Sequence, residues 1–152
     1  MYYKLREDLG FRGWDGAPYA VHCFPSGETQ FIAETFFLAL SFCDGQFDCD
    51  SAMLLPAYRR LIQLAVKSGT VVPCEKGDGL AERQKYILYP CRYMSVAHWS
   101  ITGRCNMRCR HCYMSAPQAK YGEISRETAL GIVDQLAEAG IFKVSLTGGE
   151  PF

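Results

Sequence analysis

The pattern of apolar and polar residues predicts a first folded unit over residues 1–75. Residues 18–24 are rich in side chains that favour β-strands, and the Pro-Ser-Gly-Glu sequence that follows them is typical of a turn. Residues 29–32 can then return as the second strand of a hairpin. An antiparallel pair of strands is therefore expected early in the chain.

Two helices are expected after this hairpin. The first covers residues 34–42 and is followed by an Asp-Gly pair that favours a helix end. The second covers residues 56–67, where apolar side chains recur at the spacing of one helix face, a proline begins the helix and a Ser-Gly pair ends it. Residues 70–72 then resume as a strand. Together these elements outline a winged-helix-like α+β domain.

A polar stretch with two glycines follows residue 75 and predicts a linker over residues 76–94. Beyond it, residues 96–102 have the pattern of a buried strand, and a long loop leads to a helix that Ser125 is expected to cap. Residues 141–147 form a second strand. A strand, a helix and a strand in this order predict a βαβ unit with parallel strands within residues 95–152.

Composition and charge narrow the range of partners. Lys and Arg together number 16, as do Asp and Glu, so the net charge is zero and a general electrostatic attraction to nucleic acid is not expected. No apolar run approaches the ~20 residues needed to span a bilayer, and the first residues lack the order of a signal peptide. These features predict a cytoplasmic protein.

Eight cysteines are many for a chain of 152 residues, and their distribution is uneven. We interpret the five scattered ones as small apolar side chains of the fold, namely Cys23, Cys43, Cys49, Cys74 and Cys91. A disulfide scaffold is disfavoured because the cytosol keeps thiols reduced. The other three cysteines lie within eight residues, and such a cluster indicates metal chemistry.

The clustered cysteines, Cys105, Cys109 and Cys112, have the spacing C-x3-C-x2-C. Three thiolates can hold three irons of a four-iron cluster and leave the fourth iron open to a small molecule. Zinc is the main rival metal, because His111 completes a Cys3His set. His111 and Cys112 are adjacent, however, and adjacent residues rarely bind one tetrahedral ion together. This adjacency disfavours zinc, and a small zinc or redox-sensing protein is the alternative interpretation.

A second motif, Gly-Gly-Glu-Pro at residues 148–151, follows the second strand of the predicted βαβ unit. The two motifs, in this order and on these elements, resemble the signatures of the radical S-adenosylmethionine (SAM) superfamily, with His111 at the usual aromatic position. The resemblance covers residues 95–152 and implies the start (β-α-β) of an α/β partial barrel of the TIM type. Such a barrel has six β/α units, so this chain is expected to be too short to act as an enzyme alone.

The resemblance also implies roles for individual residues. Cys105, Cys109 and Cys112 would bind a [4Fe–4S] cluster. The residues that would contact SAM are His111, Tyr113, Gly148, Gly149 and Glu150. No catalytic side chain is assigned. The complete enzyme would cleave SAM reductively to a 5′-deoxyadenosyl radical, using an electron donor such as flavodoxin or ferredoxin.

A winged-helix-like domain ahead of a radical SAM domain resembles the peptide-recognition modules of enzymes that modify ribosomally made peptides. Such a module holds its peptide as an added strand on a sheet edge, and the hairpin of residues 18–32 would supply that edge. A peptide or protein is therefore the expected substrate. A different alternative is a non-catalytic module that binds a peptide or DNA and carries a vestigial cluster loop. The basic residues that favour DNA are Arg59, Arg60 and Lys67.

Overall fold

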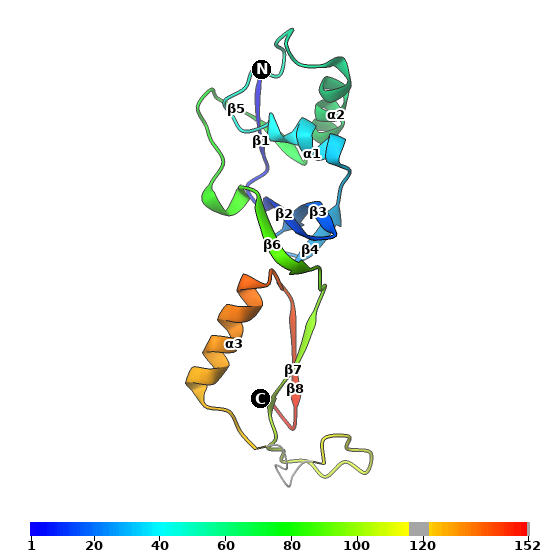
Figure 1. Ribbon diagram of the computed structural model, residues 1–152, viewed down its shortest axis with the longest axis vertical. Coiled ribbons are helices and arrows are strands. Elements are labelled where there is room, and N and C mark those ends of the chain that lie inside the picture. Colours follow the sequence, from blue (N-terminus) through cyan, green and yellow to red (C-terminus); the bar gives the residue numbers. More distant parts are fainter. Residues whose placement is uncertain (116–121, 152) are drawn as a thin grey trace. The chain divides into compact units, whose positions relative to one another are not determined.

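The computed structural model describes residues 1–115 and 122–151, which form two compact units, Met1–Arg92 and Tyr93–Phe152. Figure 1 gives the order of the elements along the chain. The first unit combines helices with small β-sheets, so its predicted α+β character is confirmed, and the second unit has one helix and one two-stranded sheet. Among the described residues, no helix has the length and hydrophobicity that a transmembrane span requires.

A four-stranded sheet forms one part of the first unit. Its strands are β2 (Leu9–Asp15), β3 (Ala17–Cys23), β4 (Glu28–Phe31) and β6 (Ile87–Arg92), in the spatial order β4-β3-β2-β6. The pairs β2–β3 and β3–β4 are antiparallel, whereas β2 and β6 run parallel. Strands β3 and β4 form the hairpin that the sequence predicted, with Gly27 in its turn at a φ of +69°.

The other part of the first unit combines two helices with a two-stranded sheet. Strand β1 (Tyr2–Leu5) is antiparallel to β5 (Val71–Cys74), and α1 (Glu34–Ser41) and α2 (Pro56–Lys67) agree with the two predicted helices. Helix α2 begins at Pro56, because the first turn of a helix does not need the N–H that proline lacks. It ends before Gly69, which adopts a φ of +70° that favours glycine.

One hydrophobic core joins both sheets and both helices of this unit. Leu5 and Val71 come from the two-stranded sheet, and Phe11 comes from the four-stranded sheet. Leu40 and Ile62 come from α1 and α2, and all five side chains are at most 3% exposed. Burying a large apolar side chain stabilises a fold by about 1.5–3 kcal/mol, so this core contributes strongly to the stability of the unit.

The sequence did not predict strands β1, β2 and β6. Strand β2 is central and buried on both faces, so it lacks the alternation of a half-buried strand, and Gly10 and Gly13 weaken its strand propensity. In the fold, glycine at position 13 is needed because a Cβ there would lie 2.1 Å from the carbonyl oxygen of Pro18. This close approach depends on the neighbouring strand and is not visible in the local sequence.

The expected linker, residues 76–94, contains a short 3-10 helix, η1 (Glu82–Gln84), and strand β6. Arg12 holds this segment against β2, because its buried guanidinium donates hydrogen bonds to the carbonyl oxygens of Arg83 and Lys85. A buried charge needs such partners. The first unit therefore extends to Arg92 instead of ending near residue 75. The predicted hairpin and helices belong to a unit that has further strands, β1, β2 and β6.

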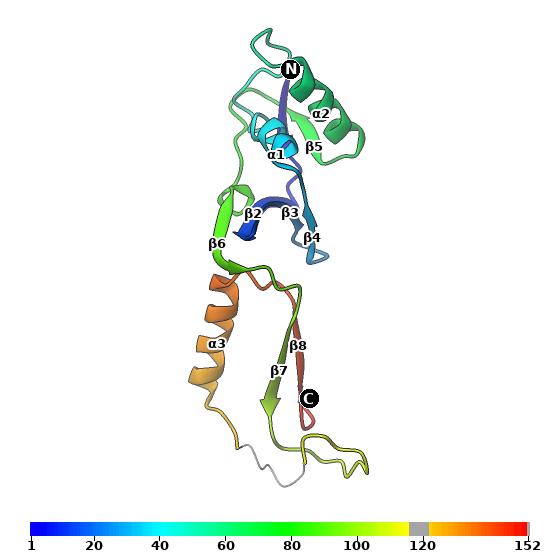
Figure 2. The same ribbon diagram turned by 45° about the vertical axis from the view of Figure 1, so that its right-hand side comes forward.

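The second unit contains the βαβ arrangement that the sequence predicted. Strand β7 (Ala97–Thr102), helix α3 (Arg126–Glu138) and strand β8 (Val144–Gly148) follow one another, and β7 and β8 form a parallel pair. Ser125 caps α3, since its hydroxyl accepts a hydrogen bond from the Thr128 N–H at 3.1 Å. Helix α3 lies beside the two strands (Figure 2), yet none of its residues is buried.

Leu40→Ala is expected to lower the free energy of unfolding of the first unit by about 2–5 kcal/mol, because it leaves a cavity in the core. Leu38→Ala on the same helix is the control, since Leu38 is 39% exposed. Leu38→Ala should lower the free energy of unfolding by only about 0.5 kcal/mol. Native-state hydrogen exchange of the β1 and β5 amides measures both effects without a contribution from the second unit. Equal losses for the two variants would contradict the assigned core.

Candidate functional site

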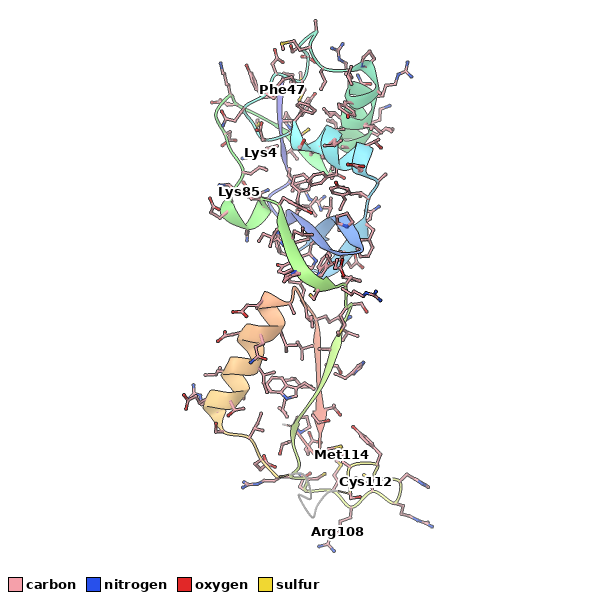
Figure 3. All side chains as sticks on the ribbon, in the orientation of Figure 1. Lys4, Phe47, Lys85, Arg108, Cys112 and Met114 are labelled. Carbon is pink, nitrogen blue, oxygen red and sulfur yellow. The ribbon has the colours of Figure 1, made fainter. Side chains whose placement is uncertain are left out.

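The three clustered cysteines lie on the loop between β7 and α3. Cys105 and Cys112 are half-buried, and Cys109 is exposed. Cys109 and Cys112 share one turn, in which the Cys112 N–H donates to the Cys109 carbonyl oxygen at 3.3 Å. Figure 3 shows Cys112 on this loop together with Arg108 and Met114. All eight cysteines belong to the described residues, and none of them is in a disulfide.

The start of this loop contacts the Gly-Gly-Glu segment directly. The Gly149 N–H donates to the Thr102 carbonyl oxygen at 2.8 Å, and the Glu150 N–H donates to the Arg104 carbonyl oxygen at 2.9 Å. These bonds continue the parallel pairing of β7 with β8 beyond the ends of the strands. The two sequence motifs therefore meet at the carboxyl edge of the β7–β8 pair, which is where parallel α/β units place their ligands.

Both glycines of the segment are needed for this approach. A Cβ at position 149 would lie 1.8 Å from the Arg104 carbonyl oxygen and 3.1 Å from the Cys105 Cβ. A Cβ at position 148 would lie 2.3 Å from the Thr102 carbonyl oxygen, and Gly148 has a φ of +129°. The absent side chains let Cys105 lie next to the Gly-Gly-Glu backbone.

An open pocket of about 310 Å³ lies at this junction, lined by Arg104, Cys105, Asn106 and Glu150. Its volume is at the lower end of the range for pockets that bind small molecules. The lining includes one predicted metal ligand and one predicted SAM contact. The pocket thus combines the two motifs in a single concave surface.

The sulfur of Cys105 has a polar partner within the loop. The Met107 N–H points at the Cys105 Sγ at 3.3 Å, and a donor in this position stabilises negative charge on sulfur. Arg104, Arg108 and Arg110 are exposed and give the loop positive charge. Positive charge and N–H donors suit thiolates and an anionic ligand.

The remaining predicted residues are less closely associated with this pocket. Tyr113 is 74% exposed, and its hydroxyl makes a hydrogen bond of 3.1 Å with the Thr147 hydroxyl, so it joins the loop to the end of β8. His111 is exposed. Within residues 1–115 and 122–151, no three His, Cys, Asp or Glu side chains lie close enough together to hold a single metal ion.

Glu123 has no motif around it that would predict a role, and the structure places it at the neck of the cysteine loop. Its carboxylate accepts hydrogen bonds from the Thr102 hydroxyl at 2.9 Å, the Gly103 N–H at 2.9 Å and the Arg104 N–H at 3.0 Å. The Thr102 hydroxyl, followed by the two N–H groups, lowers the pKa of Glu123 below its ordinary value. These bonds are therefore fully present above that ordinary pKa and are lost as the pH falls through the lowered pKa.

Cysteines outside the loop have a different environment. Cys43 and Cys49 are buried in the core of the first unit, in agreement with the prediction for them, whereas Cys23, Cys74 and Cys91 are half-buried. Burial raises the pKa of the Cys43 and Cys49 thiols, so both stay protonated at neutral pH. A protonated thiol is a poor metal ligand, so Cys43 and Cys49 are not assigned to the candidate site.

Gly149→Ala is expected to separate the loop from the end of β8, because the new Cβ would meet a backbone oxygen that cannot rotate away. The Glu150 amide should then exchange with solvent about tenfold faster, since it loses its hydrogen bond to Arg104. Gly131→Ala within α3 is the control: its Cβ meets nothing within 4 Å, and alanine favours a helix by about 1 kcal/mol. Unchanged exchange at Glu150 in the Gly149 variant would contradict the close approach.

Comparison with known proteins addresses the same part of the chain. Residues 99–152 match the family model described as the radical SAM superfamily. A relative from Methanosarcina barkeri, Fe-coproporphyrin III synthase, is 39% identical over 57 residues, which are 37% of this chain and 14% of the relative. The mycofactocin maturase MftC of Mycobacterium ulcerans is 38% identical over 53 residues, 35% of this chain and 14% of that protein.

A third relative is the antilisterial bacteriocin subtilosin biosynthesis protein AlbA of Bacillus subtilis, 36% identical over 56 residues, 37% of this chain and 12% of that protein. The matching part of the chain thus spans only 12–14% of the length of these three relatives. No solved structure matches it significantly. Radical SAM proteins use a [4Fe–4S] cluster and SAM, the two cofactors that the sequence predicted. The segment of residues 99–152, which carries both motifs, belongs to the radical SAM superfamily.

Proposed function

We propose that Cys105, Cys109 and Cys112 bind a [4Fe–4S] cluster, and that the pocket beside Cys105 receives the methionine part of SAM. The observation that carries this proposal is the direct contact between the cysteine loop and the Gly-Gly-Glu segment. Family membership of residues 99–152 supports both cofactors. The cysteines fit the cluster through their donor chemistry and their common loop, not through a preformed arrangement around one point.

In this proposal the protein binds and orients the cofactors. A cluster held by Cys105, Cys109 and Cys112 would supply one electron and an open iron, and SAM that accepted this electron would break its sulfur–carbon bond to give methionine and a 5′-deoxyadenosyl radical. The Glu150 carboxylate complements the SAM ammonium group, while Gly148 and Gly149 let the backbone approach it. His111 and Tyr113 are proposed to contact SAM from the loop. Neither is assigned a step in the reaction.

The second unit is proposed to be the start of a partial α/β barrel. Its parallel strands, the helix between them and the motifs at the carboxyl edge of the strands support this. The matching part of the chain spans 14% of two of its relatives. For the whole protein, we propose an enzyme that modifies a peptide or protein. We also propose that it receives electrons from a donor such as flavodoxin or ferredoxin. Eight thiols without a disulfide support a cytoplasmic location.

Anaerobic reconstitution with iron and sulfide tests the cluster. The chain is expected to bind about four irons and to give a paramagnetic signal after dithionite reduction. Cys105→Ala, Cys109→Ala and Cys112→Ala should each lose most of the iron, whereas Cys74→Ala, which removes a half-buried thiol outside the loop, should retain it. Iron content, sulfide content and electron paramagnetic resonance (EPR) measure these outcomes. Stoichiometric zinc in place of iron would favour the zinc-protein alternative, and a colourless chain would end the proposal.

The first unit is proposed to recognise a peptide through a winged-helix-like arrangement of its hairpin and helices. Strand β4 supports this, because it is the edge of the four-stranded sheet and is largely exposed. The Ile32 N–H donates to the Tyr19 carbonyl oxygen, so by alternation the N–H group of Thr29 faces away from β3. Two relatives are named for mycofactocin maturation and for the biosynthesis of a bacteriocin, which is consistent with a peptide partner.

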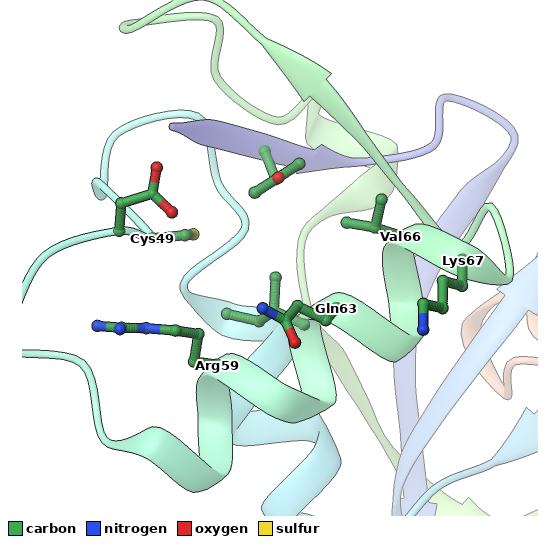
Figure 4. A pocket seen from close by; sticks show the side chains of 8 residues that line it. Cys49, Arg59, Gln63, Val66 and Lys67 are labelled. Carbon is green, nitrogen blue, oxygen red and sulfur yellow. The ribbon is translucent and has the colours of Figure 1, made fainter.

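The first unit also has a pocket that could receive a peptide. A pocket of about 220 Å³ lies between α2 and the residues around Cys49, and Figure 4 shows Arg59, Gln63, Val66 and Lys67 of α2 along it. Tyr3 of β1 also lines the pocket. The edge of β1 beside this pocket is already occupied at Tyr3, because the Gly45 N–H donates to the Tyr3 carbonyl oxygen. We therefore assign the peptide strand to β4.

Titration of the chain with the short peptides encoded beside its gene, followed by NMR, tests this assignment. The amide shift of Thr29 is expected to move most, because this group would donate to the added strand. Thr29→Pro removes this donor and should weaken binding about tenfold. Shift changes confined to the Arg59 pocket would place the peptide there instead, and no changes in either region would exclude peptide binding by this unit.

A further inference from the structure

We propose that Glu123 is a positioning residue that holds Cys105 in register with Gly149 and Glu150. The inference rests on the proposed function, because it assigns a role within that same site. Glu123 lies just before α3, at the far end of the loop from Cys105. Its carboxylate nevertheless contacts residues 102–104, at the near end of the loop. One side chain thus joins the two ends of the segment that carries all three loop cysteines.

The backbone before Cys105 is held from two sides. The N–H groups of Gly103 and Arg104 donate to Glu123, and the carbonyl oxygens of Thr102 and Arg104 accept from Gly149 and Glu150. Each peptide group is planar, so a hydrogen bond to it restricts the orientation of the whole plane. The plane between Gly103 and Arg104 is restricted by Glu123, and the next plane, which leads into Cys105, is restricted by Glu150.

The effect of these bonds on the Cys105 sulfur is geometric. Without Glu123, residues 102–104 would keep their contacts with the Gly-Gly-Glu segment and the hydrogen bond from the Arg104 N–H to the Thr102 hydroxyl oxygen at 3.0 Å, but the Gly103 N–H would lose the Glu123 carboxylate as its acceptor. The far end of the loop would also lose its link to the near end. Long loops have many conformations, and a contact that closes the neck removes those in which the two ends separate. Glu123 therefore limits where Cys105 can present its sulfur.

A carboxylate is well suited to accept the hydrogen bonds from residues 102–104. One carboxylate oxygen accepts all three hydrogen bonds, from the Thr102 hydroxyl and from two neighbouring N–H groups, and the second oxygen also accepts from Thr102, at 3.0 Å. Charged acceptors make stronger hydrogen bonds than neutral ones. Glutamine keeps one acceptor oxygen without the charge, and alanine removes the acceptor altogether. The loss of order at the loop neck should be largest in Glu123→Ala, smaller in Glu123→Gln and absent in the unchanged chain.

A purely structural role at the start of α3 is the competing explanation, and Glu127 provides the control for it. Glu127 lies in the first turn of the same helix, where a negative charge is favourable. Glu127→Gln removes the same charge from the same region without touching residues 102–104. A difference between the Glu123 and Glu127 variants therefore reports on the loop neck and not on the helix.

The experiment compares the unchanged chain with Glu123→Ala, Glu123→Gln and Glu127→Gln. In the iron-free chains, hydrogen exchange of the Gly103 amide should become about tenfold faster in Glu123→Ala and remain unchanged in Glu127→Gln. After anaerobic reconstitution, the EPR signal of the reduced cluster is recorded before and after SAM is added. The change caused by SAM should be reduced in Glu123→Ala, intermediate in Glu123→Gln and unaltered in Glu127→Gln.

The outcomes separate this inference from the proposed function. If the unchanged chain takes up iron and responds to SAM, and both Glu123 variants match Glu127→Gln in exchange and in EPR, the positioning role is overturned while the cluster site stands. Faster exchange with an unaltered SAM response also overturns it, because the neck would then have no influence on the site. If the unchanged chain takes up no iron, the proposed function fails first, and the role of Glu123 falls with it.

Discussion

The site depends on the close approach of two backbone segments, residues 102–104 and residues 148–150. Parallel pairing of β7 with β8 brings the ends of both strands to one edge, and two further hydrogen bonds continue the pairing into the loops. The approach requires glycine at positions 148 and 149, since any Cβ there would overlap a carbonyl oxygen. The first loop cysteine and the Glu150 backbone thereby become neighbours, although they are far apart in the sequence.

The two units reach stability in different ways. The first has a continuous core that includes Leu5, Leu40 and Ile62, and even its central strand carries a buried arginine with carbonyl partners. In the second, α3 has no buried residue, and Leu130 and Val133 are about half exposed. Parallel strands are normally covered on both faces. The candidate site therefore belongs to the less buried of the two units, where single hydrogen bonds such as those of Glu123 have more influence on geometry.

The surroundings of the cysteines differ between the two units. In the core of the first unit, burial raises the pKa of Cys43 and Cys49 and keeps both thiols neutral, so they act as small apolar side chains. On the loop of the second unit, Cys105 and Cys112 are half-buried and Cys109 is exposed, in a segment with three arginines. The same residue type is suited to packing in one place and to metal binding in the other.

Local sequence patterns determined the elements that local forces stabilise: the hairpin of β3 and β4, the proline-initiated helix α2, the Ser125 cap and the order of the βαβ unit. They also predicted the candidate chemistry, because the cysteine motif and the Gly-Gly-Glu-Pro motif are each short and local in the sequence. Strands β2 and β6 were decided only by tertiary structure, since glycines and a buried arginine form a strand only when neighbours supply close packing and carbonyl partners. The same holds for the hydrogen bonds of Glu123, which join it to residues distant in the sequence, and no pattern of nearby residues encodes such contacts.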